Sequence, residues 1–389
     1  MVMKRIFAAL IFASVLCVVA AQAASCSVIA DIVDGLSTLE ITDATVPLNT
    51  EAATEPPAEN TIPFFKTPEI EPCEMPSEHF ADPIEKEASE IIDGAIAKAI
   101  SYVNAMKDDR HGNVGFSFDE DANGYLSALT AEQKELYDRF VSAGKNCERL
   151  TVSEKEYGGD LKAAFFALYE PMTYSEPGIA SYFTIDAKSQ LLSYEMTTRY
   201  TSVFDRYFDP DRDANTDLST GDVTMEKIKH DAKLLDCVVK RIIGFMPDGL
   251  STYDKYYYLA AVLSEKVSYD KRPDNCFTAY GALIGGRAVC EGYTGAYYLL
   301  CREAGLWCAY RNGQPSGVGH TWNMVKLDSG IYNVDVTWCD GYGKPYEKDW
   351  YDCFMRSDAD FEYDGHNATS GVTGTGDFEP CPYEKMTGR

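Results

Sequence analysis

The sequence predicts an α+β fold in which a C-terminal core carries an N-terminal helical layer. Apolar residues recur at helical spacing within residues 77–250, as in the stretch from Ile84 to Met106. Later in the chain the pattern changes to short runs of strand type, HTWNMVKL at 320–327 and IYNVDVTW at 331–338. A chain of 389 residues, of which 45% are hydrophobic, can form one large core or two modest ones.

The helical region shows local start and stop signals. Asp82 and Pro83 are typical of an N-cap and a first-turn proline. Thr130 and Gln133 predict a capping box, and Gly144 is the expected end of that helix. Further elements are expected as a helix over 161–169, a strand over 183–200, a helix ending near Pro247 and a helix beginning at Ser251. We predict that this region packs on the core; a substrate-binding domain is the alternative.

The stretch that begins at Gly285 carries a candidate nucleophile. Gly285 and Gly286 interrupt the chain before apolar residues that recur at helical spacing from Cys290, and Gly305 is the expected helix stop. Cys290 should therefore lie in the first turn of a helix. Unpaired N–H groups and the positive end of the helix dipole favour a thiolate there.

The strands HTWNMVKL and IYNVDVTW are expected to form a hairpin, preceded by a strand over 306–311. With a two-residue loop, Leu327 pairs with Gly330. His320 and Asp335 are then diagonal neighbours on one face, within reach of each other's side chains. A three-residue loop would place them on opposite faces. We predict the arrangement with both residues on one face.

Cys290, His320 and Asp335 together predict a catalytic triad. His320 can accept the proton of the Cys290 thiol, and Asp335 can orient the imidazole. Asp335 lies among apolar residues, where a buried carboxylate needs a partner. Taken alone, Cys290 would be interpreted as a buried or disulfide-bonded cysteine.

The motifs AVCEGY, GHTWN and YNVDVTW resemble the transglutaminase-like superfamily in its bacterial extracellular branch. VSYD at 267–270 and TAYGAL at 278–283 also resemble the lead-in of that family. The resemblance implies a papain-like core over residues 251–365, with Cys290, His320 and Asp335 as the triad. It implies acyl transfer through a thioester, with no cofactor and no metal. Whether water or a lysine amine accepts the acyl group stays open, and a peptidase or amidase is slightly preferred over protein cross-linking.

The first 24 residues predict export. They contain a positively charged start, an apolar stretch and an A-x-A cleavage site, which are typical of a signal peptide. Cys26 follows in a context similar to a lipoprotein box, so a surface anchor through Cys26 is the alternative to free secretion. Residues 25–76 are rich in Thr, Pro and Glu, as in an acidic linker, and residues 366–389 are expected to be a loose tail.

The net charge of −26 argues against nucleic acid and anionic lipid as partners. A protein or peptide substrate, extracellular or in a cell wall, is expected instead. Ten of the 12 cysteines remain once Cys17 is removed with the signal and Cys290 is reserved as nucleophile. An exported protein could join them in disulfides whose connectivity the spacing does not define.

Some motifs have a simpler interpretation. The acidic loops Asp119–Gly124 and Asp209–Asp217 partly match calcium loops but lack required residues, so solvated turns are preferred. The histidines without a companion motif are expected to be structural or exposed: His79, His111, His230 and His366. The alternative from another functional class is a non-catalytic surface module that binds peptides and retains a relic triad.

Overall fold

The computed structural model describes residues 69–371, apart from gaps at 107–115, 191–192, 201–223, 274, 316–317, 348 and 364. The predicted signal peptide 1–24, Cys26 and most of the predicted linker lie outside the described residues, as do the second acidic loop and residues 372–389. Within the described ranges, no helix combines the length and apolar character needed to cross a bilayer.

A five-stranded antiparallel sheet organises the C-terminal half, in the order β10-β6-β7-β8-β9. Its strands are β6 (Cys308–Gly313), β7 (His320–Leu327), β8 (Gly330–Val334), β9 (Phe354–Arg356) and β10 (Ala368–Gly371). Residues 366–389 are predicted from the sequence to be a loose tail, whereas β10 pairs with β6 at the edge of this sheet. The core therefore extends beyond residue 365.

The central hairpin has the predicted register. Leu327 pairs with Gly330 across a two-residue loop. The prediction that strand β8 continues to Trp338 is wrong, because β8 ends at Val334 and α10 (Val336–Tyr342) follows. Asp335 is the N-cap of α10, and its Oδ1 accepts the N–H of Trp338 at 3.2 Å. An aspartate whose side chain caps a helix favours the start of that helix over the continuation of the strand.

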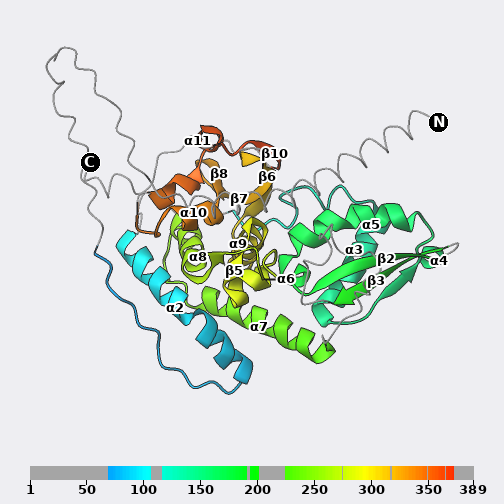
Figure 1. The fold of residues 1–389 in the computed structure, drawn as a ribbon, viewed down its shortest axis with the longest axis horizontal. Coiled ribbons are helices and arrows are strands. Elements are labelled where there is room, and N and C mark those ends of the chain that lie inside the picture. The colour runs from blue at the N-terminus through cyan, green and yellow to red at the C-terminus, as the bar shows by residue number, and fades with distance from the viewer. Residues whose placement is uncertain are drawn as a thin grey trace, which may run out of the picture.

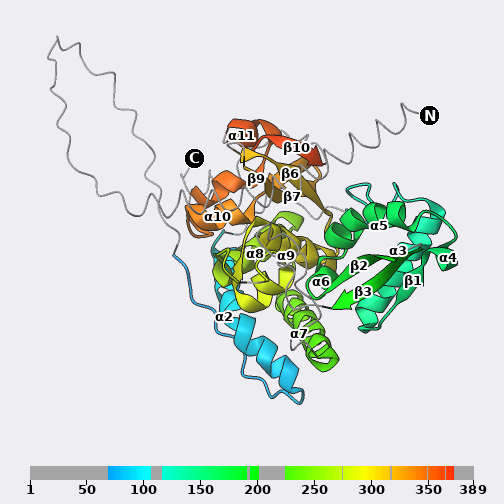
Figure 2. The same ribbon diagram turned by 45° about the vertical axis from the view of Figure 1, so that its right-hand side comes forward.

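Four long helices share one hydrophobic core with the sheet. They are α2 (Pro83–Met106), α7 (Met225–Gly244), α8 (Thr252–Lys266) and α9 (Cys290–Glu303). Helices α8 and α9 contact the strands of the sheet, and α2 and α7 pack on α8 and α9. Thr224 and Ser251 cap α7 and α8 through their side-chain oxygens. Two shorter strands, β4 (Ser268–Tyr269) and β5 (Arg287–Ala288), pair in parallel just before α9. Figures 1 and 2 show α2 and α7 on the outer side of α8 and α9.

Residues 126–200 form a second lobe with its own hydrophobic cluster. It contains α3 (Ala131–Asn146), α4 (Glu154–Tyr157), α5 (Leu161–Glu170), β1 (Thr151–Ser153), β2 (Phe183–Gln190) and β3 (Ser193–Tyr200). The three strands are antiparallel in the order β1-β3-β2. Figure 2 shows this lobe to one side of the larger sheet. The predicted helical layer is thus confirmed for α2 and α7, whereas the described residues of 126–200 form a mixed lobe.

The predicted end of α3 is also wrong. The Thr130 capping box begins the helix as expected, but the helix passes through Gly144 and ends at Asn146. Cys147 then takes the left-handed conformation with φ 53°. A Cβ on Gly144 would lie 2.5 Å from Cγ2 of Ile179, so this glycine permits close packing and does not end the helix.

Several hydrogen bonds join the second lobe and its flanking loop to the core. Asn123 donates to the carbonyl of Tyr310 at 2.7 Å and accepts the Tyr310 N–H at 2.8 Å, at the middle of β6. Nearby, Asp121 accepts the backbone N–H of Leu126 at 2.7 Å, so the first acidic loop is a hydrogen-bonded turn. Arg302, in the last turn of α9, donates a hydrogen bond to Glu176 of the second lobe at 2.9 Å.

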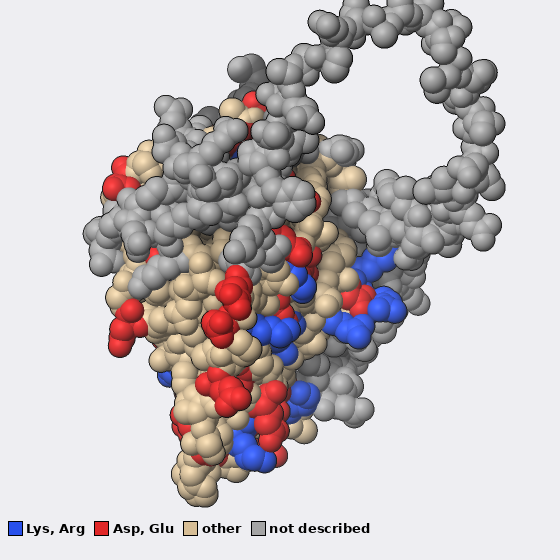
Figure 3. Space-filling view, turned by 90° about the vertical axis from the view of Figure 1, so that its left-hand side faces the viewer, with Lys and Arg blue, Asp and Glu red and all other residues tan. Residues whose placement is uncertain are grey.

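Charged side chains of both signs are mixed on the surface. On the face seen in Figure 3, Lys and Arg lie among Asp and Glu and form no separate basic patch.

The described cysteines are thiols: Cys73, Cys147, Cys237, Cys276, Cys290, Cys301, Cys308, Cys339 and Cys353. Burial, followed by the neighbouring Cys308 thiol, raises the pKa of Cys301 well above its usual range. Disulfide formation on export stays a prediction.

Candidate active site

Helix α9 places Cys290 at its first residue, as the sequence predicted. Val289 is the N-cap and makes no side-chain cap hydrogen bond. The N–H of Val289 donates to the carbonyl of Cys276 at 3.0 Å, which fixes the chain just before the helix. Cys290 is 5% exposed. Its thiol therefore lies at the positive end of a 14-residue helix, in an almost closed environment.

Two hydrogen bonds hold the first turns of α9 against β7. The hydroxyl of Thr294 donates to the carbonyl of Thr321 at 3.0 Å, and the amide of Asn323 donates to the carbonyl of Thr294 at 3.2 Å. Cys290 lies four residues before Thr294 and so shares its helix face. That face is turned toward the start of β7, where His320 precedes Thr321.

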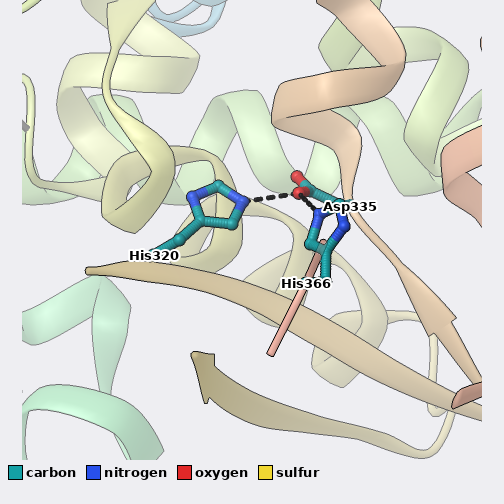
Figure 4. Close-up of side chains that lie close together, drawn as sticks. All are labelled: His320, Asp335 and His366. Carbon is teal, nitrogen blue, oxygen red and sulfur yellow. Dashed lines mark hydrogen bonds and ion pairs between the residues drawn. The ribbon is translucent and has the colours of Figure 1, made fainter. Parts of the chain in front are cut away.

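His320 and Asp335 are joined as predicted. Nε2 of His320 lies 2.5 Å from Oδ2 of Asp335, and both side chains are buried. Figure 4 shows the other ring nitrogen of His320 turned away from Asp335. Because Nε2 is bonded to the carboxylate, Nδ1 of His320 is the atom available for proton exchange with a nucleophile.

The carboxyl group of Asp335 is held ionised. Burial alone would raise its pKa, but the charge and hydrogen bond of His320, followed by the hydrogen bond from His366, outweigh burial and hold the pKa well below its usual range. The expectation that a buried aspartate here needs a partner is confirmed. The structure supplies two imidazole partners instead of one.

The second partner, His366, was missed by the sequence analysis. Its Nε2 lies 3.0 Å from the same Oδ2 atom of Asp335, and the side chain is completely buried (Figure 4). His366 was predicted to be structural or exposed and to lie in the tail, so it was not placed at the site. His366 follows Asp335 by 31 residues, and no motif surrounds it. No local pattern could have indicated this contact.

Aromatic rings surround the histidines. Trp322 and Trp338 each lie 5.8 Å from the His320 ring, measured between ring centroids. Trp338 also lies 4.1 Å from the His366 ring, and Phe361 lies 4.2 Å from it. These rings exclude water from the carboxylate, so the electrostatic interactions of Asp335 are stronger than they would be in solvent.

One buried ion pair anchors the segment that leads to His366. Arg311 of β6 donates two hydrogen bonds to Asp358, the first residue of α11 (Asp358–Tyr363), one of them at 3.0 Å. Arg311 also donates to Asn333 at 3.3 Å. Helix α11 carries Phe361, whose carbonyl accepts the backbone N–H of His366 at 2.8 Å. Arg311 thus connects the sheet to the surroundings of His366.

Replacing Asp358 by alanine is expected to destabilise the protein by roughly 3 kcal/mol, because it leaves the largely buried Arg311 without its anionic partner. Equilibrium urea unfolding measures this change. The matched control is Glu90→Ala, which removes an exposed pair with Lys86 and should cost less than about 1 kcal/mol. Equal effects for the two variants would contradict a special role for the Arg311–Asp358 pair.

The donor atoms of His320, Asp335 and His366 lie within 4.8 Å of one another, close enough for a metal ion to be considered. The geometry fits an acid–base group better. Nε2 of His320 already lies at hydrogen-bond distance from Oδ2, and a metal ion would have to separate these two atoms. The arrangement resembles a nucleophile–base–orienter set, with Cys290 on the helix beside it.

Comparisons with known proteins agree with the motifs. Residues 244–339 match the family model described as the transglutaminase-like superfamily, and this segment contains Cys290, His320 and Asp335. The resemblance and the α+β fold class predicted from the sequence are confirmed. The match supports a papain-like cysteine enzyme in general.

Two solved structures are similar over part of their length. One is a TGase, 15% identical, with a TM-score of 0.25, covering 39% of this chain and 43% of that chain. The other is a proposed cysteine protease from Cytophaga hutchinsonii, 13% identical, with a TM-score of 0.23, covering 49% of this chain and 65% of that chain. This chain thus spans less than two thirds of either structure. No curated protein matches it.

Proposed function

We propose that this protein is an exported cysteine enzyme that transfers acyl groups from peptide or glutamine amides through a thioester on Cys290. The observation that supports this proposal most is the buried His320–Asp335 hydrogen bond beside the N-terminal end of α9. A hydrogen-bonded histidine and carboxylate near a helix-terminal cysteine can generate a nucleophilic thiolate.

The proposed reaction assigns one role to each residue. The sulfur of Cys290 attacks the carbonyl carbon, and the C–N bond breaks as Nδ1 of His320 gives its proton to the leaving amine. Asp335 orients the imidazole and stabilises its charged form. The backbone N–H of Cys290 is the proposed donor to the oxyanion. The remaining thioester is then cleaved by water or by an amine, and His320 takes a proton from that acceptor.

Hydrolysis by water is slightly preferred as the second half of the reaction, which makes the protein a peptidase or amidase. Transfer to a lysine amine is the second candidate, and burial favours it. Cys290 is 5% exposed and His320 4% exposed, so few water molecules can reach a thioester between them. Protein or peptide material outside the cell, including cell-wall peptides, is the proposed substrate class.

The experiment that tests the proposal is mass spectrometry of glutamine-containing peptides incubated with the protein, with and without a fluorescent primary amine. Amine adducts that depend on Cys290 would identify a transglutaminase. Cleaved or deamidated peptides in both conditions would identify a hydrolase. Cys290→Ala should abolish either product. Cys73→Ala, which removes a thiol that is not part of the proposed site, should leave both products unchanged.

A non-catalytic peptide-binding module is the competing hypothesis. It predicts no Cys290-dependent product and slow alkylation of Cys290 by iodoacetamide near pH 6, since an ordinary thiol has a pKa of about 8.5. An activated Cys290 should instead react faster than the more exposed Cys73 at that pH, despite its burial. Slower reaction of Cys290 together with no turnover would contradict the enzyme hypothesis.

A further inference from the structure

His366 reaches the site from a separate segment of chain. It lies between α11 and β10, and its backbone N–H donates to the carbonyl of Phe361 at 2.8 Å. Its side chain is completely buried. A buried histidine far from the motif residues would be an ordinary packing residue if it contacted only apolar groups. This one places a ring nitrogen on the carboxylate that orients the proposed base.

The two oxygens of Asp335 receive three donors. Oδ2 lies 2.5 Å from Nε2 of His320 and 3.0 Å from Nε2 of His366, while Oδ1 accepts the N–H of Trp338 at 3.2 Å. The hydrogen bond from Trp338 fixes one edge of the carboxylate and that from His366 fixes the other. A carboxylate held at both edges cannot rotate away from His320.

The hydrogen-bond pattern defines the tautomer of His366. Asp335 is ionised and can only accept, so Nε2 of His366 must carry a hydrogen. Nδ1 of His366 is buried and has no hydrogen-bond partner among the described residues. A proton there would lack an acceptor, and it would add a positive charge to a ring whose centroid lies 5.7 Å from that of His320. The neutral, Nε2-protonated form fits this environment.

The described surroundings of His366 are mainly aromatic. Asp335 and His320 are titratable groups that lie against its ring. The other neighbours are the rings of Trp338, Phe361 and Trp322, at 4.1, 4.2 and 5.2 Å between centroids. These rings hold the imidazole edge toward Oδ2 and contribute no charge. The hydrogen bond between His366 and the proposed triad is the one to Asp335.

We propose that His366 is a positioning residue, which holds Oδ2 of Asp335 against His320 so that Nδ1 of His320 faces Cys290. This inference rests on the proposed roles of Cys290 and His320. The site is thus a Cys–His–Asp triad whose aspartate is fixed by a second, neutral imidazole.

The test compares two substitutions that differ in one property. Gln at position 366 keeps an N–H donor at about the distance of Nε2, whereas Phe keeps the ring and removes the donor. Alkylation of Cys290 by iodoacetamide near pH 6 should be about 10-fold slower in His366→Phe than in the native protein. His366→Gln should restore the rate to within about 3-fold. No substrate is needed for this measurement.

The ring signals of His320 provide a readout that loss of stability would not change. The chain has 5 histidines, so selective ¹³C and ¹⁵N labelling of histidine can resolve their ring signals by NMR. The ring ¹⁵N signals of His320 are expected to shift in His366→Phe and to return in His366→Gln, because Oδ2 loses and regains a second donor. Unchanged His320 signals and an unchanged alkylation rate in His366→Phe would overturn the proposal. Equal slowing by Phe and Gln, with no change in the His320 signals, would also overturn it.

The native protein gives an independent test if His366→Phe does not fold. Its ¹⁵N spectrum at neutral pH should show His366 with a hydrogen on Nε2 and none on Nδ1. A hydrogen on Nδ1 of His366 would overturn the assigned tautomer. If Cys290→Ala leaves turnover intact, the proposed function fails, while the NMR result still reports on His366 and Asp335.

Discussion

Replacing Asp335 by asparagine is expected to lower turnover by about 10⁴-fold, the effect of disabling the orienting carboxylate in related nucleophile–histidine systems. Asparagine cannot satisfy all three donors that Asp335 accepts. If its amide nitrogen faces the histidines, His320 must accept through Nε2, and the hydrogen moves to Nδ1, where the base should be unprotonated. If its nitrogen faces Trp338, two N–H groups meet. Steady-state kinetics with the peptide substrates identified by mass spectrometry measures the loss.

Asp340→Asn is the matched control for this substitution. Asp340 lies on the same helix, α10, and accepts the hydroxyl hydrogen of Tyr293 at 2.7 Å. Whereas the pKa of Asp335 is held below its usual range, burial raises the pKa of Asp340 to about 6. Its replacement should change turnover by less than about 3-fold, since the hydrogen bond to Tyr293 can be kept. Similar losses in both variants would contradict the assigned role of Asp335.

Asp335→Asn should also change how the stability of the protein depends on pH. The folded pKa of Asp335 lies below its unfolded value of about 3.9, so its ionised form stabilises the fold above that pH. This contribution is lost as the pH falls below about 4 toward the folded pKa. The native protein should therefore lose stability in acid more steeply than Asp335→Asn. Urea unfolding at several pH values in the acid range compares the two slopes.

The parts of the site that follow local rules could be predicted from the sequence. The helical spacing after Cys290 placed it at the start of α9, and the two-residue loop gave the register that brings His320 to Asp335. The end of β8 was not predicted. Val334, Val336 and Thr337 are β-branched and favour a strand, but the capping side chain of Asp335 begins a helix among them.

The features that the sequence did not reveal depend on contacts between distant segments. His366 meets Asp335 only because β10 returns to pair with β6 and α11 is anchored to Arg311. The second lobe appears only when the strand pattern of residues 183–200 is folded into a hairpin that pairs with β1. Periodicity describes one element at a time and contains no information on such pairings.

Gly292→Ala is expected to destabilise the protein by about 3 kcal/mol and to lower turnover by about 100-fold. Gly292 lies in the first turn of α9, two residues after Cys290. A Cβ there would lie 2.5 Å from the carbonyl oxygen of Cys276, 2.8 Å from Cβ of Ala288 and 3.1 Å from the carbonyl oxygen of Thr278. These atoms are backbone or short side chain, so none can rotate away.

The clash would act directly on the nucleophile. The carbonyl of Cys276 accepts the N–H of Val289, the residue just before Cys290, so displacement of Cys276 moves the start of α9. Gly295→Ala is the control on the same helix. Its Cβ would meet the hydroxyl of Tyr310 at 3.4 Å and Cβ of Pro177 at 3.5 Å, which are ordinary contacts. Alanine also favours a helix over glycine by about 1 kcal/mol, so Gly295→Ala should be neutral or stabilising.

Thermal unfolding and Cys290 alkylation, measured together, separate the two expected effects of Gly292→Ala. A lower melting temperature with slow alkylation is expected, because the thiol moves relative to His320 while the helix is strained. Gly295→Ala should keep both values close to those of the native protein. If Gly292→Ala and Gly295→Ala gave the same melting temperature and the same alkylation rate, a Cβ at position 292 would not clash with Cys276 and Ala288. The close placement of Cys290 beside β7 would then be wrong.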